Sequence, residues 1–286
     1  MYMLNRNSKA NFLVTKASGE VVPFSEEKLK HSLIKAGASD ETAIGIIELL
    51  KPKLFSGVST KKIYRWAFNL LRSASRPMAA KYYLKKAIME LGPSGFPFER
   101  FVAEILKYKG YTTRVGETVA GKCVRHEIDV IAEKEDSVFM IECKFHIREG
   151  TMCDVKVPLY IHSRFKDVEF EWLKNPVNKA KVLKGWLVTN TKFSVDAVKY
   201  GLCSGLNLLG WNFPEHQGLK NQIDEMGLYP VTCLTSLTKS EKQALLNRNI
   251  VLCKDLLYQE KILQDAGVRN VRIKTVMSEL EQIAGK

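Results

Sequence analysis

The sequence has no long hydrophobic run, no closely paired cysteines and no phosphate-binding loop of the P-loop type. No apolar stretch approaches the roughly 20 residues of a transmembrane helix, and residues 1–11 hold no signal-peptide core. The six cysteines form no Cys-x-x-Cys pair, which disfavours zinc and predicts reduced, mostly buried thiols. The pattern Gly-x(4)-Gly-Lys-Ser/Thr is absent, so P-loop hydrolysis of ATP is not expected. We therefore expect a cytoplasmic protein without membrane contact.

Positive charge is concentrated in the first third of the chain. Residues 1–95 hold 16 Lys and Arg against 7 Asp and Glu, a balance of +9, whereas residues 96–286 hold 28 against 24, a balance of +4. Such an excess predicts a phosphate-bearing partner, either a nucleotide or a nucleic acid, although charge that only keeps the protein soluble is the alternative. The length of 286 residues allows two domains, or one domain with an appendage.

Two short apolar segments, residues 126–132 and 138–144, are joined by charged and polar residues, which predicts two strands of a hairpin. Because side chains alternate along a strand, Glu142 and Lys144 point to the same face. Asp129 lies in the middle of the first strand, where a small adjustment of register brings it beside Glu142. Two carboxylates can bind a hard divalent cation while a lysine orients an attacking water. The same spacing also occurs on solvated strand faces.

The arrangement Asp-x(12)-Glu-x-Lys resembles the active site of the PD-(D/E)xK nuclease superfamily. Residues in the same order upstream extend the likeness, namely an amphipathic helix that begins at Phe98-Glu99 and the pair Gly110-Tyr111. Together these features resemble the Mrr-like branch of restriction endonucleases, which is akin to archaeal Holliday-junction resolvases, over about residues 95–212. The resemblance implies a central mixed sheet that helices cover on both faces.

The same resemblance implies roles for individual residues. Asp129 and Glu142 would hold Mg²⁺, with Lys144 beside the attacking water. Glu99 would assist from the first helix, and Glu104 is the alternative on that helix.

Other polar residues near the motif are weaker candidates. His146 shares the strand face of Glu142 and Lys144, and His126 lies just before the first carboxylate; either is a general-base candidate, with a hydrogen-bonded structural role as the alternative. Three cations of the following helical region are expected to contact DNA phosphates, unless they only solvate a helix face: Lys156, Arg164 and Lys166.

The N-terminal stretch predicts a β-hairpin, residues 12–16 and 21–24 around a turn at Gly19, and then helices over 26–35, 40–50, 60–73 and 78–91. Residues 12–91 resemble the ATP-cone, the regulatory nucleotide-binding domain known from ribonucleotide reductases. The carriers are the segments 14–19, 22–29 and 83–88. The resemblance implies that Lys16, Lys28 and Lys85 face the triphosphate of ATP or dATP, with the Gly19 turn beside it.

The C-terminal part is less informative. Residues 214–227 have the composition of a linker, and 228–286 predict a small helical region. Segments around Asn249 are similar to a helix-hairpin-helix, with asparagine where the turn glycine is expected, and a plain packing domain is the alternative.

The sequence thus predicts a multi-domain α/β protein with an ATP-cone over 10–92, an endonuclease-like domain over 95–213 and a helical region over 228–286. The expected function is a Mg²⁺-dependent DNA endonuclease regulated by an adenine nucleotide. Two alternatives stay open: a catalytically idle, nucleotide-gated DNA-binding module, or a regulatory partner of another enzyme. Assembly into a homo-oligomer is also left open.

Overall fold

The structure is a computed structural model that describes residues 12–284 apart from 149, 177, 179 and 180. The described residues fall into two compact units, which part between Tyr83 and Leu84. No helix in the described part of the chain combines the length and the apolarity needed to cross a membrane.

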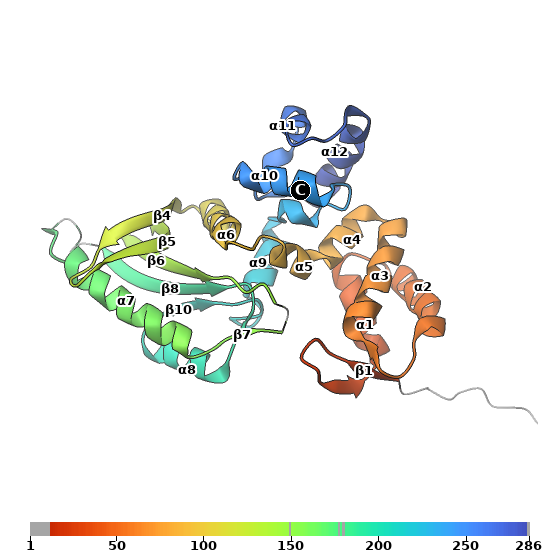
Figure 1. Cartoon of the computed structure of the whole chain (residues 1–286), viewed down its shortest axis with the longest axis horizontal. Coiled ribbons are helices and arrows are strands. Elements are labelled where there is room, and N and C mark those ends of the chain that lie inside the picture. The colour runs from red at the N-terminus through yellow and green to blue at the C-terminus, as the bar shows by residue number, and fades with distance from the viewer. Residues whose placement is uncertain (1–11, 149, 177, 179–180, 285–286) are drawn as a thin grey trace, which may run out of the picture. The chain divides into compact units, whose positions relative to one another are not determined.

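The first unit combines a small sheet with helices (Figure 1). Strands β1 (Leu13–Thr15) and β2 (Val21–Pro23) form an antiparallel hairpin, and β3 (Val58–Ser59) pairs in parallel with β1. The helices are α1 (Glu26–Lys35), α2 (Asp40–Leu50), α3 (Thr60–Ala74) and α4 (Arg76–Tyr82), with a 3-10 turn η1 (Lys51–Lys53). A serine hydroxyl caps the start of each α-helix, and a leucine core that includes the fully buried Leu33, Leu50 and Leu71 lies among them.

The helix predicted over residues 78–91 is broken at Tyr83. Helix α4 ends before it, and α5 (Leu84–Met89) belongs to the second unit. The reason is burial within that unit: Leu84 and Ile88 are fully or almost fully buried, and the Ala87 carbonyl accepts a hydrogen bond from the Thr232 hydroxyl at 2.8 Å. The boundary between the compact units therefore lies earlier than the predicted boundary between residues 92 and 95.

A five-stranded mixed sheet forms the centre of the second unit. Its strands are β4 (Thr112–Ala120), β5 (Arg125–Lys134), β6 (Ser137–Lys144), β8 (Val182–Thr189) and β10 (Asn207–Leu209), in the order β10-β8-β6-β5-β4. Strands β4, β5 and β6 pair antiparallel, whereas β6, β8 and β10 run parallel. A second parallel pair is formed by β7 (Met152–Cys153) and β9 (Lys192–Phe193). The predicted mixed sheet is confirmed.

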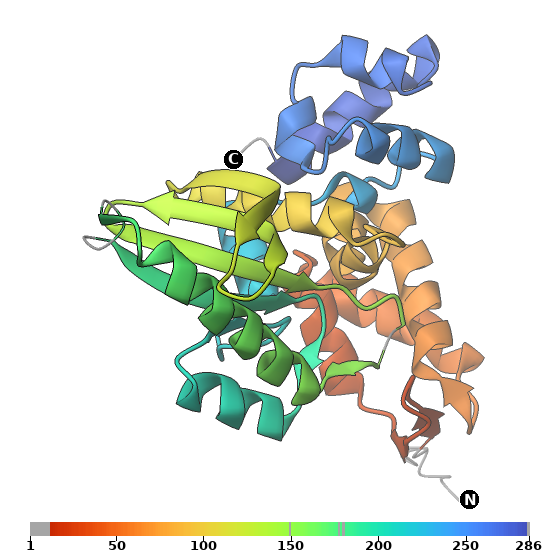
Figure 2. The same cartoon turned by 60° about the vertical axis from the view of Figure 1, so that its left-hand side comes forward.

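Helices cover both faces of this sheet. Helices α7 (Lys156–Trp172) and α8 (Val195–Cys203) lie on one face, and α6 (Phe96–Tyr108) lies on the other (Figures 1 and 2). The fully buried Phe98 and Phe101 anchor α6, while Ile161 of α7 and Ala197 of α8 pack with Leu187 of β8. Burial of the two sheet faces by apolar helix stripes is what holds the three layers together.

The chain beyond the sheet is helical. Its elements are α9 (Leu219–Met226), η3 (Val231–Cys233), α10 (Lys239–Asn247), η4 (Cys253–Leu256), α11 (Glu260–Asp265) and α12 (Asn270–Ala284). The predicted linker at 214–227 is therefore wrong in its second half, where α9 buries Leu219 and Ile223 completely. Asn249 follows α10 with φ of 61°, the left-handed conformation that asparagine tolerates better than most residues.

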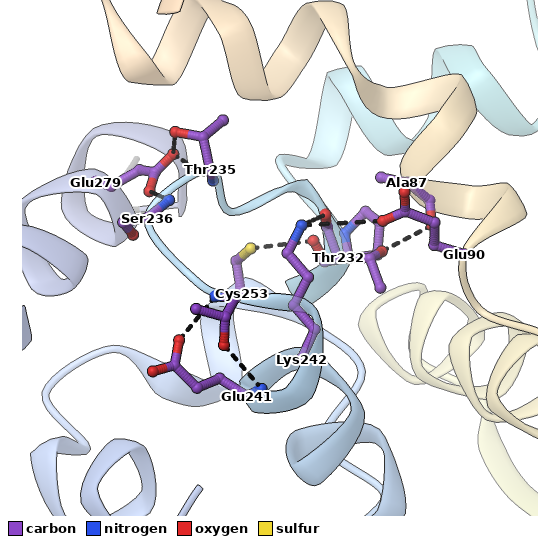
Figure 3. A network of polar contacts seen from close by, with 11 residues as sticks. Ala87, Glu90, Thr232, Thr235, Ser236, Glu241, Lys242, Cys253 and Glu279 are labelled. Atoms are coloured by element: carbon purple, nitrogen blue, oxygen red, sulfur yellow. Dashed lines mark hydrogen bonds and ion pairs between the residues drawn. The ribbon is translucent and has the colours of Figure 1, made fainter. Parts of the chain in front are cut away.

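Buried acids hold the C-terminal helices together (Figure 3). The Glu279 carboxylate accepts hydrogen bonds from the backbone N–H groups of Thr235 and Ser236, at 2.8 Å each, and from the Thr235 hydroxyl at 2.7 Å. Glu241 forms a reciprocal capping box with Thr238 at the start of α10. These buried carboxylates are fully paired, so they stabilise the turn rather than mark a reactive site.

The same region is attached to α5. Lys242 of α10 donates to the Thr232 carbonyl at 2.6 Å and lies 3.9 Å from the Glu90 carboxylate, and Thr232 in turn donates to Ala87 (Figure 3). Helix α5 is thus held by the C-terminal helices.

Candidate active site

The β5–β6 ladder ends where the predicted acidic residues begin. Its last backbone pair on this side is Val130 with Ile141. Beyond that pair, the Cys143 N–H donates to Oδ2 of Asp129 at 2.7 Å, so a side chain replaces the next ladder contact. Asp129 is therefore next to the Glu142-Cys143-Lys144 segment, as the hairpin pattern predicted. Burial raises the pKa of the Asp129 carboxyl, and the Cys143 hydrogen bond opposes that rise.

Glu142 is paired with a cation from α7. Its Oε2 lies 2.8 Å from Nη1 of Arg164, and the guanidinium also donates to the Glu127 carbonyl. Both side chains are mostly buried, with exposed fractions of 22% and 15%. Burial, followed by the charge of Asp129, raises the pKa of Glu142 to about 7 despite the opposing effect of Arg164. The site holds more negative charge than one guanidinium compensates.

Glu99 is influenced by the charges of the same carboxylates. It stands in the first turn of α6, and burial, followed by the charges of Asp129, Glu127 and Glu142, raises its pKa to about 7. The alternative on this helix, Glu104, forms an ion pair with Lys107 at 2.7 Å. Of the two candidates, Glu99 is the one whose pKa responds to the charges of the strand carboxylates.

Lys144 ends β6 with an exposed side chain, and its charge lowers the pKa values of Asp129 and Glu142. His146 follows it, and burial, then the charge of Lys144, lowers its pKa. Its Nε2 is buried without a hydrogen-bond partner among the described residues.

His126 has a different setting. Its Nε2 is 2.7 Å from Asp167 of α7, and Asp167 also accepts from the Cys123 N–H at 2.9 Å. The histidine hydrogen bond is the main cause that lowers the pKa of Asp167 to about 2. This network ties the β4–β5 connection to α7, so His126 has the structural role that the sequence left as the alternative.

The expected DNA contacts lie on α7 in different settings. Lys156 is exposed at the start of the helix, and Lys166 pairs with Glu169 at 2.7 Å. Arg164 contacts Glu142, a partner that the sequence did not suggest. The sequence interpretation also missed the buried polar run Thr189 to Thr191, although three polar residues directly after an apolar strand are a recognisable signal.

The carboxylates suit a magnesium ion in their chemistry. Within the described residues, no three His, Cys, Asp or Glu side chains converge closely enough to form a metal-binding group. Asp129 and Glu142 nevertheless offer the oxygen ligands that Mg²⁺ prefers, often with several waters retained. Their raised pKa values show that further positive charge would stabilise the ionised pair. Asp129 and Glu142 are the residues that would hold the ion, and Arg164 contacts one of them.

The residues predicted to bind a nucleotide are divided between the units. Lys16 pairs with Glu20 at 2.9 Å beside the Gly19 turn, where φ is +86°, and Lys28 is exposed on α1. Lys85 belongs to the second unit, where its ammonium donates to the Asn190 carbonyl and lies 4.4 Å from the centre of the Trp211 ring. Lys85 therefore has partners in the sheet domain that the sequence did not predict.

Comparisons with known proteins match most of the second unit. The family model described as "Restriction endonuclease" matches residues 92–209, and the one described as "AF1548-like, C-terminal" matches residues 229–284. An "Uncharacterized protein" of Archaeoglobus fulgidus is 35% identical over 185 residues, which are 64% of this chain and 100% of that protein.

Two solved structures are also similar. The "Crystal Structure of Protein of Unknown Function AF1548" has 34% identity and a TM-score of 0.55, and the match covers 66% of this chain and 98% of that one. The MspJI restriction endonuclease in complex with a 27-mer oligonucleotide has 15% identity and a TM-score of 0.33, over 74% of this chain and 44% of that one. The second likeness is too low to carry an argument.

The mixed sheet between helices and the matched domain define a protein with a restriction-endonuclease domain and an added C-terminal domain. Because the chain spans nearly all of AF1548 at 34% identity, it belongs to the AF1548-like family. The resemblance of residues 12–91 to an ATP-cone stays a prediction from the sequence.

The raised pKa of Glu142 predicts how metal-free stability depends on pH. A carboxyl whose folded pKa of about 7 exceeds its ordinary 4.5 stabilises the fold below pH 4.5 and loses that contribution as pH rises through 7. Wild-type protein in EDTA should therefore lose stability relative to Glu142→Gln between pH 5 and pH 8, by at most about 3 kcal/mol. Urea unfolding at several pH values measures the difference. A difference that is independent of pH would show that Glu142 titrates normally.

Proposed function

We propose that the protein is a Mg²⁺-dependent DNA endonuclease. The observation that carries the proposal is the placement of half-buried Asp129 beside Glu142, with Lys144 two residues further along the same strand as Glu142, inside a restriction-endonuclease domain. A solvated strand face would not need to place two carboxylates in half-buried positions that raise their pKa values. DNA as the substrate is inferred from the class of the domain and from the net charge of +13.

The proposed reaction is hydrolysis of a phosphodiester, in which a water oxygen bonds to phosphorus and the bond to one ester oxygen breaks. Bound Mg²⁺ supplies Lewis acidity and charge compensation. Lys144 orients the attacking water and stabilises the charge that develops on the phosphate oxygens. Glu99, with a pKa of about 7, can accept the proton that the water loses.

Arg164 has two partners in this proposal. Without a cation it neutralises Glu142, and a cation bound at Glu142 would compete for the same carboxylate oxygens. The Arg164 Nη1 group that now contacts Glu142 would then be available to a DNA phosphate, while Nη2 keeps its bond to the Glu127 carbonyl. Arg164 would thus contact DNA, as the sequence predicted, and its contact with Glu142 explains why it lies beside the candidate active site.

Removal of the catalytic side chains should separate binding from cleavage. Lys144→Ala should lower the rate of cleavage by about 100-fold or more with DNA affinity nearly unchanged, because the ammonium acts on charge that develops in the transition state. Asp129→Asn should abolish cleavage through loss of the metal. A plasmid-nicking assay with Mg²⁺ on several DNA forms measures both variants.

Lys184→Ala is the matched control, since Lys184 is an exposed lysine on β8, paired with Phe139 near the opposite end of β6. Cleavage by Lys144→Ala and Asp129→Asn at the wild-type rate would exclude this active site. Tight DNA binding by wild-type protein without cleavage under any condition would favour the idle DNA-binding module instead.

Removal of the Arg164 side chain should strengthen the binding of Mg²⁺ and weaken the binding of DNA. Arg164→Ala should lower the Mg²⁺ concentration needed for half of the thermal stabilisation by about tenfold, because a charged hydrogen bond that competes with the ion is gone. The same variant should bind DNA more weakly. The slope of the logarithm of the binding constant against the logarithm of the salt concentration should fall by about one, as expected for the loss of one phosphate contact. The first effect is tested by thermal unfolding at increasing Mg²⁺ concentration. The second is tested by DNA affinity measured at increasing salt concentration. An unchanged or higher Mg²⁺ requirement would contradict the competition.

A narrower proposal concerns the first unit. We propose that it binds ATP or dATP and thereby regulates cleavage, on the basis of its resemblance to the ATP-cone and the +9 balance of residues 1–95. The β1–β2 hairpin, with its Gly19 turn, and helices α1 to α4 follow the predicted order of elements, whereas the predicted helix over 78–91 is broken at Tyr83. Its turn reads Lys-Ala-Ser-Gly, without the arginine and carboxylate usual in that family.

The nucleotide proposal predicts a ligand-dependent stability. At a hundredfold excess over its dissociation constant, a nucleotide should stabilise the unit that binds it by about 2.7 kcal/mol. The midpoint temperature of thermal unfolding of the full chain should rise with ATP or dATP. The double variant with Lys16→Ala and Lys28→Ala should show no such rise. The double variant Lys35→Ala with Lys53→Ala loses the same charge from exposed positions in the same unit and should retain it. Absence of a shift at millimolar nucleotide would exclude this regulation and leave the nuclease proposal intact.

A further inference from the structure

Three consecutive polar residues are buried at the end of β8. Among the described residues of the sheet domain, Thr189, Asn190 and Thr191 are the polar side chains that are buried, with exposed fractions of 0%, 0% and 4%. A buried polar group destabilises a fold unless it is hydrogen-bonded, so these three residues need hydrogen-bond partners that offset the cost of their burial. The partners lie on the strand that carries the candidate catalytic lysine.

The parallel pairing of β6 and β8 brings these partners together. Lys144 is in register with Thr189, so both strands end at the same edge of the sheet. The Thr189 hydroxyl donates to the Lys144 carbonyl at 2.8 Å. The Asn190 amide holds the next segment from both sides, since its Oδ1 accepts from the His146 N–H at 2.8 Å and its Nδ2 donates to the His146 carbonyl at 2.9 Å.

These contacts begin where the β5 ladder has already ended. The last β5–β6 backbone pair is Val130 with Ile141, so β5 gives no backbone pairing to residues 144–146. On the other side, the pairing with β8 ends at Lys144. The side chains of Thr189 and Asn190 therefore replace the missing ladder contacts just beyond the catalytic strand.

Asn190 is itself fixed from the side of α5. Its Nδ2 contacts the sulfur of Met89 at 3.1 Å, and its carbonyl accepts a hydrogen bond from the Lys85 ammonium. Lys85 is further held over the Trp211 ring. A buried amide with partners on two elements has one orientation that satisfies all of them, so it can hold a neighbouring segment in a single position.

We propose that Thr189 and Asn190 are positioning residues that fix the backbone of residues 144–146, and with it the Lys144 ammonium, relative to Asp129 and Glu142. The inference rests on the proposed nuclease function and names residues that serve the same site without touching the substrate. The physical reason is that an ammonium on the last residue of a strand moves with any fraying of that end. Displacements of about 1 Å at a reacting group can lower a rate by roughly 100-fold.

A pair of isosteric substitutions separates positioning from stability. Thr189→Val removes the hydrogen bond to Lys144 and keeps the shape, while Thr189→Ser keeps the hydroxyl. The matched control is Thr232→Val, because Thr232 is also buried and its hydroxyl also donates to a carbonyl at 2.8 Å. That carbonyl belongs to Ala87 of α5 and not to a residue of β6. Both valine variants should lower the melting temperature by similar amounts.

The kinetic result should differ between them. Thr189→Val should lower kcat for DNA cleavage by roughly 10- to 100-fold with KM within about twofold, whereas Thr189→Ser and Thr232→Val should keep kcat near the wild-type value. A second measurement is independent of cleavage: amide hydrogen exchange of a peptide covering residues 143–147. Exchange there should be at least about tenfold faster in Thr189→Val and unchanged in Thr232→Val.

The proposal requires both changes. Amide hydrogen exchange at the wild-type rate in Thr189→Val would overturn it. A loss of kcat in Thr232→Val as large as that in Thr189→Val would overturn it as well. Failure of wild-type protein to cleave any DNA would instead overturn the proposed nuclease function, and the exchange experiment would still decide whether Thr189 fixes this segment.

Discussion

The central constraint in this structure is the close placement of two half-buried carboxylates at one edge of a sheet. Asp129 and Glu142 meet where the β5–β6 ladder stops, and the protein compensates their charge with one backbone N–H and one guanidinium. That compensation is incomplete, since the pKa values of both carboxyls are raised. A fold selected only for stability would replace such groups with apolar side chains. The proposed nuclease function would supply additional positive charge at this edge through a bound cation.

The surroundings of the pair follow from that constraint. Helix α7 supplies Arg164 from one face of the sheet, and the first turn of α6 supplies Glu99. Strand β8 supplies Thr189 and Asn190 from the neighbouring position in the sheet. Three separate elements thus converge on the two strands of one hairpin, and parallel pairing of β6 with β8 is what brings Thr189 to the edge where Lys144 lies.

Helix α5 has a special position in the second unit. It follows directly on the last helix of the first unit along the chain, and its residues contact both the sheet domain and the C-terminal helices. The two buried acids of the C-terminal region, Glu241 and Glu279, are satisfied within that region. The AF1548-like C-terminal domain is thus internally stabilised and joined to α5 through Thr232 and Lys242.

The sequence by itself determined the hairpin of β5 and β6, the amphipathic helix α6 and the approach of Asp129 to Glu142, because alternation and turn composition act over short distances. It also indicated the mixed sheet and the helical C-terminal region. Only the tertiary structure decided the break at Tyr83, since burial of Leu84 and Ile88 depends on residues far along the chain. The same holds for Arg164 with Glu142, Lys85 with Asn190, and the Asn190 clamp on His146. Each of these pairs joins residues separated by 22 or more positions, through a side chain of at least one of them, and no local pattern encodes which distant partner a polar group will meet.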